Sequence, residues 1–80
     1  MTLKLLLAYE TRIGTFYIGR SDDGRFHPVF EDESLGSYWT AEQAIDDLAG
    51  GHTFSISSGV DTATLGIPSD IGDWERVVRA

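Results

Sequence analysis

Hydrophobic residues recur at helical spacing in one stretch of the chain, and residues suited to capping flank it. The apolar positions, spaced i, i+3, i+4, i+7 and i+8, are Ala41, Ala44, Ile45, Leu48 and Ala49. Thr40 is a favourable N-cap, and Gln43 three residues later completes a capping box. Trp39, just before the cap, can pack against Ala44. Gly50 can take the left-handed conformation that ends a helix. The pattern therefore predicts a helix over residues 41–49.

Apolar and polar residues alternate along much of the first 30 residues, which is typical of strands, although Leu6 and Ala8 blur the alternation in the first predicted strand. The predicted strands cover residues 3–10, 15–20 and 25–30. Residues 11–14 form a predicted turn, and Ser21-Asp22-Asp23-Gly24 is a strong hairpin signal. Pro28 cannot donate a hydrogen bond to a neighbouring strand. The third strand is therefore expected at a sheet edge, or with a bulge at this proline.

The remaining sequence gives weaker signals. A short strand is expected within residues 35–39 and another within 52–56, with loops at 31–34 and 57–61. Ser69 is expected to cap a single turn over residues 70–75, after which Val77 and Val78 dock on the body. We see one domain, residues 1–80, of the α+β class. We expect a small antiparallel β-sheet of three to five strands with one main α-helix packed on a face.

Charge is unevenly distributed along the chain. The net charge is −7, and no Lys or Arg occurs between Arg25 and Arg76. This interval holds ten carboxylates: Glu31, Asp32, Glu33, Glu42, Asp46, Asp47, Asp61, Asp70, Asp73 and Glu75. Direct nucleic acid binding needs clustered basic residues and is not expected, and the same holds for an anionic membrane surface.

The cysteine and hydropathy patterns bear on compartment. The chain has no cysteine, so neither a disulfide nor a thiolate metal site stabilises it. The apolar run Leu3–Ala8 is interrupted by Lys4 and is too short for a signal-peptide core or a membrane span. We expect a soluble cytoplasmic protein.

No catalytic or cofactor motif stands out. Asp22-Asp23-Gly24 lacks the rest of a calcium loop and is better explained as a hairpin turn. His27 and His52 are the only histidines, with no zinc-ligand spacing between them; His52 follows the predicted helix, whose dipole favours an imidazolium. No serine lies in a G-x-S-x-G elbow, and no glycine-rich phosphate loop occurs. We therefore expect a non-enzyme without cofactor or metal.

Some of the acidic residues are poor choices for folding. Glu42 and Asp46 form a like-charge i, i+4 pair that costs roughly 0.2–0.5 kcal/mol. Asp46 and Asp47 fall in the last helical turn, where the helix dipole disfavours anions by roughly 0.3–1 kcal/mol each. Two interpretations remain open: a solubilising surface, and a surface that meets a cationic partner.

Exposed aromatic residues beside the acids would anchor such an interface, and Trp74 followed by Tyr38 are the best candidates. Trp74 is preferred because acidic residues surround it in the sequence. The predicted partner-binding residues are Glu31, Asp32, Glu33, Tyr38, Glu42, Asp46, Asp47, Asp70, Asp73 and Trp74.

Several stretches resemble small uncharacterised proteins of proteobacteria and their mobile elements. They are Asp23-Gly24, Leu35-Gly36-Ser37-Tyr38, the helix from Ala41 to Leu48 with Gly50-Gly51-His52, and Leu65-Gly66-Ile67-Pro68. The resemblance implies a fold and transfers no active-site residue. In size and acidity the chain is also similar to phage anti-CRISPR proteins, several of which fill the DNA-binding groove of an effector complex with acidic surface.

The leading hypothesis is a non-enzymatic acidic module, monomer or homodimer, that occupies a basic, nucleic-acid-binding surface of a larger protein. Its most specific form is a phage inhibitor of a CRISPR effector complex, acting in the host cytoplasm. The alternative is a self-associating structural or regulatory bacterial domain that pairs through a sheet edge, with acidity serving solubility. A third hypothesis is a small enzyme or ligand-binding protein with a pocket that joins a histidine to a carboxylate.

Overall fold

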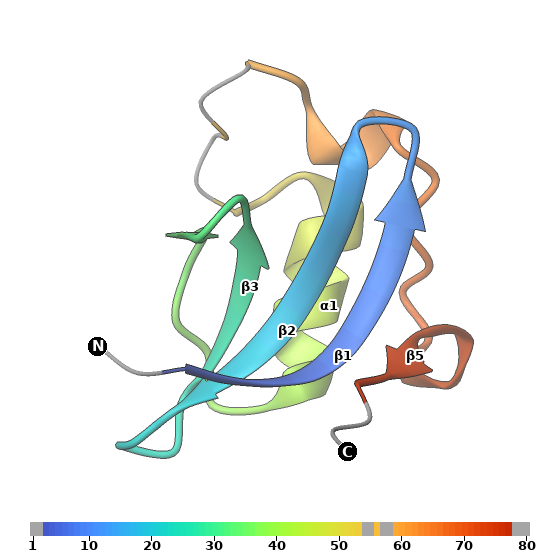
Figure 1. Ribbon diagram of the computed structural model, residues 1–80. Helices are drawn as coiled ribbons and strands as arrows, with labels where there is room; N and C mark the ends of the chain where they lie inside the picture. The colour runs from blue at the N-terminus through green and yellow to red at the C-terminus, as the bar shows by residue number, and fades with distance from the viewer. Residues whose placement is uncertain (1–2, 54–55, 57–58, 78–80) are drawn as a thin grey trace.

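The computed structural model describes residues 3–53, 56 and 59–77. It confirms the α+β class: a five-stranded antiparallel sheet carries one main helix, α1 (Ala41–Gly50) (Figure 1). The sheet order is β4-β3-β2-β1-β5. The strands are β1 (Leu3–Thr11), β2 (Gly14–Ser21), β3 (Phe26–Phe30), β4 (Glu33–Ser34) and β5 (Glu75–Arg76). Two single-turn 3₁₀ helices, η1 (Thr62–Thr64) and η2 (Ile71–Asp73), follow α1 along the chain.

Helix α1 covers one face of the sheet, because the apolar side chains of both elements meet in a single core. Phe16 of β2 and Phe30 of β3 stack with their ring centroids 4.5 Å apart. The helix contributes the side chains at its predicted apolar positions. The helical residues that are fully buried are Ala44, Ile45 and Leu48. This packing, more than helix propensity, stabilises a helix of ten residues.

A bulge in β1 explains why the first strand alternates poorly. Leu5 pairs with Gly19, whereas Leu7 pairs with Ile18, so Leu6 is the extra residue on its strand. Because Gly19 and Ile18 are neighbours on β2, Leu5 and Leu7 face opposite sides of the sheet. Leu7 packs against the core, and Leu5 does not. Three consecutive leucines are thereby divided between two faces.

Pro28 lies where its missing N–H is harmless. Its residue pairs with Ile18 of β2, while its carbonyl accepts a hydrogen bond from Leu35 N on the other side of β3, at 2.7 Å. In an antiparallel strand the N and the carbonyl of one residue point the same way, so the proline nitrogen also faces away from β2. On that side β3 has only the two-residue partner β4. The expectation of an edge strand or of a bulge at Pro28 was therefore wrong: β3 lies one strand in from the edge and pairs with β2 in regular register, and its short neighbour β4 needs no N–H from the proline.

The predicted boundaries of the helix hold to within one residue. Thr40 accepts a hydrogen bond from Gln43 N at 3.1 Å, which confirms it as the N-cap. The left-handed residue at the other end is Gly51, with φ 76°, one position later than expected. Gly51 N bonds Leu48 O, and His52 N bonds Asp47 O, which is a Schellman motif.

The weaker predictions fare less well. Residues 52, 53 and 56 are not in a strand, and positions 54 and 55 lie outside the described residues. Residues 35–39 contribute an isolated bridge between Tyr38 and Phe26 in place of a strand. Asp70, not Ser69, caps η2. Residue 75, predicted as the end of a turn, forms β5 with Arg76 against β1, and Val77 N bonds Leu6 O; Val78 is not described.

Candidate partner-binding surface

Helix α1 and strand β3 begin side by side and run in the same direction (Figure 1). Just before the helix, Tyr38 exchanges two backbone hydrogen bonds of 2.8 Å with Phe26, the first residue of β3. The last residue of β3 and the last turn of α1 therefore lie at the same end of the molecule. Acidic residues that are separate in sequence meet there.

The turn between β3 and β4 places two of these acids in a left-handed backbone conformation. Glu31 and Asp32 have φ values of 50° and 65°, as the two central residues of a type I′ hairpin turn require. Glycine, asparagine and aspartate are the residues that favour such turns, so Glu31 is the less favourable of the two at positive φ. Both side chains are exposed.

The helix adds carboxylates of two kinds. Glu42 and Asp46 are exposed, whereas Asp47 is half-buried and accepts a hydrogen bond from the Tyr38 hydroxyl. Burial, this hydrogen bond and the charge of Asp47 raise the pKa of Tyr38 to about 12. Tyr38 is thus bound within the protein by its hydroxyl, and Asp47 has a structural role that its position in the sequence did not indicate.

We call the set of carboxylates at this end of the molecule the acidic end. Asp61 belongs to it because it caps η1, which packs on the end of α1 through the bond from Thr62 Oγ1 to Leu48 O at 2.7 Å. Arg12, which contacts Thr64 of η1, is the one cation placed near it in the described part of the chain. The C-terminus of the helix adds its partial negative charge. The members of the acidic end are Glu31, Asp32, Glu33, Asp46, Asp47 and Asp61.

The remaining predicted acids lie elsewhere. Asp70 accepts from Gly72 N at 2.9 Å and is the N-cap of η2, so a local backbone need explains it. Asp73 borders an open groove of about 420 Å³ at the β1–β5 edge, together with Glu10 and Glu75. Glu42 lies in the first turn of α1, where the helix dipole favours an anion. The predicted partner-binding residues therefore lie on separate parts of the molecule and do not form one surface.

Trp74 does not offer the exposed ring that we expected. Its side chain is 5 % exposed and packs in the core, 5.7 Å from the ring of Tyr9, and its Nε1 donates to Pro68 O. The three acidic neighbours in sequence, Asp70, Asp73 and Glu75, misled the prediction, because a short turn can direct polar residues outward and one aromatic residue inward. The exposed tryptophan is Trp39, at 69 %, with the Arg25 guanidinium 4.0 Å above its ring. It does not pack against the helix as predicted.

His27 joins three strands through a buried polar network. Its Nδ1 lies 3.0 Å from Ser34 Oγ and its Nε2 lies 3.1 Å from Ser21 Oγ. Ser34 Oγ donates to Gly36 O, and Ser21 Oγ donates to the Asp23 carboxylate, which lowers the pKa of Asp23. His27 and Ser21 are each only 6 % exposed. The network braces the sheet, and its hydroxyls are enclosed where a substrate does not reach.

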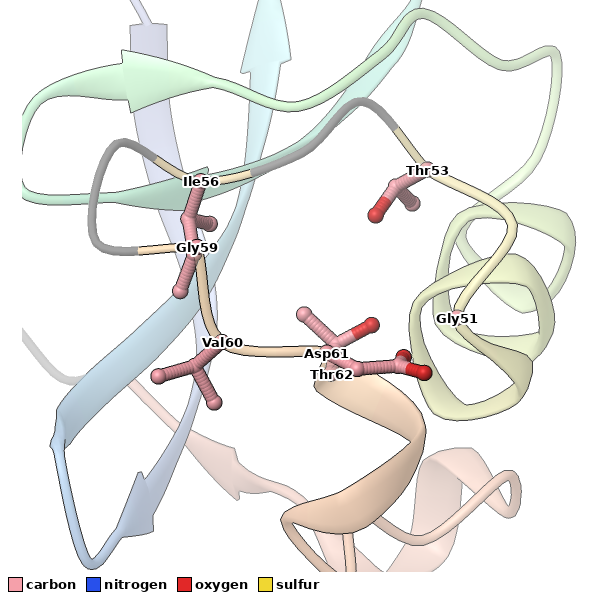
Figure 2. A pocket seen from close by; sticks show the side chains of 7 residues that line it. All are labelled: Gly51, Thr53, Ile56, Gly59, Val60, Asp61 and Thr62. Atoms are coloured by element: carbon pink, nitrogen blue, oxygen red, sulfur yellow. The ribbon is translucent and has the colours of Figure 1, made fainter.

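A small polar pocket of about 280 Å³ lies beyond the C-terminus of α1, between Gly51 and the segment that enters η1 (Figure 2). Two of its polar side chains, Asp61 and Thr62, already have partners within the protein. Asp61 Oδ1 accepts from Ala63 N, and Thr62 Oγ1 donates to the carbonyl of Leu48. These groups serve the backbone of the pocket wall, and no histidine borders the pocket.

Two further properties of the described residues concern cofactors and membranes. Among them, no three His, Asp or Glu side chains are grouped closely enough to hold a metal ion. In the same residues, no helix has the length and apolar character needed to cross a bilayer. Comparison with protein-family models, curated proteins and solved structures gave no match to this chain.

Proposed function

We propose that the protein is an acidic protein-binding module whose acidic end occupies a basic, nucleic-acid-binding surface of a larger partner. The observation that carries the proposal is the Glu31–Asp32 turn. Two carboxylates stand there in left-handed conformations, one of which, at Glu31, is unfavourable for its side chain, and both lie at the end of the molecule where the helix dipole is negative. Because these residues lower the stability of the fold, we expect them to serve another purpose, and binding to a cationic partner is such a purpose.

The exposure and hydrogen bonding of these carboxylates favour a smaller set of residues for this role. Asp47 and Asp61 already bond within the protein, whereas Glu31, Asp32 and Asp46 are exposed. Their carboxylates would stand where phosphates normally sit. Long-range attraction would speed association, and added salt would weaken it.

In its most specific form, the module is a phage-encoded inhibitor that prevents a CRISPR effector complex from binding DNA. Support comes from size, acidity and the clustering of carboxylates, so the effector is one member of a broader class of basic partners. The alternative, self-association through a sheet edge, has less support because both edge strands, β4 and β5, are two residues long. Short edge strands are a common protection against such pairing.

The test is capture of partners from bacterial lysate on immobilised protein, followed by elution with duplex DNA and then with high salt. Proteins held through a nucleic-acid-binding surface should leave with the DNA, because both ligands compete for one site. Asp46→Lys should abolish this retention. Asp22→Lys is the matched control, since it makes the same charge change in the exposed β2–β3 turn at the opposite end.

Two outcomes would count against the proposal. Duplex DNA might fail to displace the retained proteins, or the Asp46→Lys and Asp22→Lys baits might retain them equally. Asp47 is left unchanged in this design, because reversing its charge would also break the hydrogen bond from Tyr38.

A further inference from the structure

An apolar groove of about 580 Å³ lies between β1, the start of α1 and the segment that joins η2 to β5. This is the end of the molecule opposite the acidic end, near the lower part of β1 in Figure 1. The groove is lined by Lys4, Leu5, Leu6, Leu7, Ala41, Ile71, Arg76 and Val77. Its volume falls within the range of roughly 300–1,000 Å³ that is usual for small-molecule sites.

The lining is unusual for this protein. The chain has 13 acidic and 6 basic residues, yet the described residues that line the groove include two cations, Lys4 and Arg76, and no carboxylate. Its other six lining residues are all apolar. Ile71 leaves 38 % of its surface exposed there, although it is a large aliphatic residue. The groove therefore combines an uncovered apolar floor with a local positive charge.

The cation at the start of β1 has no ion-pair partner among the described residues, although Asp22 borders a small pocket together with Lys4 and Arg20. Lys4 pairs across the β1–β2 ladder with Arg20, and like charges directly opposite each other disfavour strand pairing. The described residues provide no ion pair to Lys4 or Arg76. The first turn of α1, at Ala41, adds the positive end of a helix dipole. An anionic group bound here would relieve this repulsion.

We infer that the groove binds a long-chain fatty carboxylate. The alkyl chain lies along Leu6, Ile71 and Val77, where it removes apolar surface from water. The carboxylate lies between Lys4 and Arg76 and accepts charge-assisted hydrogen bonds. A nucleic acid needs more than two cations, and a second copy facing the same groove would bring Lys4 against Lys4. This site is independent of the acidic end and of the proposed function.

The experiment titrates the isolated protein with octanoate, decanoate and dodecanoate below their micellar concentrations, by calorimetry and by amide chemical shifts. Affinity should rise about fourfold per methylene group added. The shifts should centre on Leu5–Leu7, Ile71 and Val77. Dodecyl maltoside, which has the same alkyl chain and no charge, should bind much more weakly.

Substitutions test the charged half and the apolar half of the site separately. Arg76→Gln and Lys4→Gln should each weaken dodecanoate binding about tenfold, the loss expected for one charge-assisted hydrogen bond. Ile71→Ser, at an exposed position, should weaken binding and flatten the dependence on chain length. Arg12→Gln removes a cation at the far end of β1 and should leave the affinity unchanged.

The inference is overturned if affinity does not depend on chain length, or if Arg12→Gln weakens binding as much as Arg76→Gln. It is also overturned if dodecanoate fails to bind and the protein is a dimer that Ile71→Ser dissociates, because a second copy would then cover the groove. Since each readout uses the protein alone, failure here leaves the capture experiment with duplex DNA unaffected.

Discussion

Glu31 and Asp32 are the residues where folding and function are most clearly opposed. Both have positive φ, which Asn tolerates better than Glu at position 31 and Gly better than Asp at position 32. The double substitution Glu31→Asn, Asp32→Gly should therefore raise the free energy of unfolding by about 1–2 kcal/mol. The check is a urea titration, in which the midpoint should rise at an unchanged slope.

The same variant should bind the partner less well, so stability and binding should move in opposite directions. Glu31→Gln is the control, since it removes one charge and keeps the unfavourable φ; its midpoint should barely change. A lower urea midpoint in the double variant would show that the two acids stabilise the turn. The argument for a binding role would then fail.

The hydrogen bond from Tyr38 to Asp47 makes the stability of the protein depend on pH in the alkaline range. The pKa of Tyr38 is about 12 in the folded protein, above its ordinary value of 10.0, so the folded state holds the proton more tightly. The resulting stability is fully present below pH 10 and is lost as the pH rises from 10 to about 12. Tyr38→Phe should cost about 1 kcal/mol at neutral pH and remove this loss.

Tyrosinate absorbance measured against pH, compared between wild type and Tyr38→Phe, isolates this titration. Burial is the first cause of the shift, so Asp47→Asn should move the pKa only part of the way toward 10. A Tyr38 titration that stays unchanged in Asp47→Asn would mean that the carboxylate does not hold the hydroxyl.

Residue-level roles were the least predictable from the sequence. The acidic composition correctly indicated many exposed carboxylates, but charge alone does not distinguish Asp46 from Asp47. Their difference depends on Tyr38, which β3 places beside the last turns of the helix. Trp74 was misplaced for the same reason: its burial depends on Tyr9, 65 positions earlier in the chain, and no local pattern reports such a contact.

At the scale of the element, the end of α1 depends on one glycine. A Cβ at Gly51 would lie 2.6 Å from Asp61 Oδ1 and 3.0 Å from Ala63 Cβ, at a φ of 76°. Gly51→Ala should lower the free energy of unfolding by about 2 kcal/mol or more, through both strain and steric overlap. Thermal unfolding followed by circular dichroism measures the loss.

Gly66→Ala is the matched control for that substitution. Gly66 has a similar φ of 70°, but a Cβ there would meet no atom within 4 Å, so only the backbone cost of about 1 kcal/mol applies. The difference between the two variants measures the steric part. Equal losses would mean that the loop around Asp61 and Ala63 yields to the new methyl group.

Elements defined by local signals were predictable, and those defined by distant partners were not. The helix carries its own cap, apolar face and stop signal, and β1, β2 and β3 carry alternation with a hairpin turn. Strand β5 has two residues and exists only because β1 offers Leu7 and Ala8 as partners. Likewise η1 depends on the acceptor at Leu48, 14 residues before Thr62.

At the scale of the whole molecule, charge is polarised along the direction of α1. Carboxylates gather at the C-terminal end of the helix, whereas at the other end three cations, Lys4, Arg20 and Arg25, offset the nearby acids Asp22, Asp23 and Glu42. This arrangement explains how one small domain can present an acidic surface and, separately, a groove suited to an anion. The net charge of −7 still makes repulsion the dominant long-range term.

The balance of these charges predicts opposite salt effects on folding and on binding. At 10 mM ionic strength the screening length is roughly 30 Å, comparable to the 29 Å long axis of the molecule, so every carboxylate repels the others. Raising the salt to 0.5 M should remove most of this repulsion and stabilise the fold by about 1 kcal/mol, or roughly 4–8 °C in Tm. Calorimetry in NaCl tests this, with Asp46→Lys expected to show a smaller gain.

Partner binding should weaken over the same range of salt, because the attraction between the acidic end and a basic surface is screened too. A Tm that rises with salt, together with partner binding that weakens with salt, distinguishes a surface maintained for binding from one maintained for folding. If Tm instead falls as NaCl is added, ion pairs within the protein outweigh the repulsion. The carboxylates at the acidic end would then have a structural justification, and the main argument for a cationic partner would be lost.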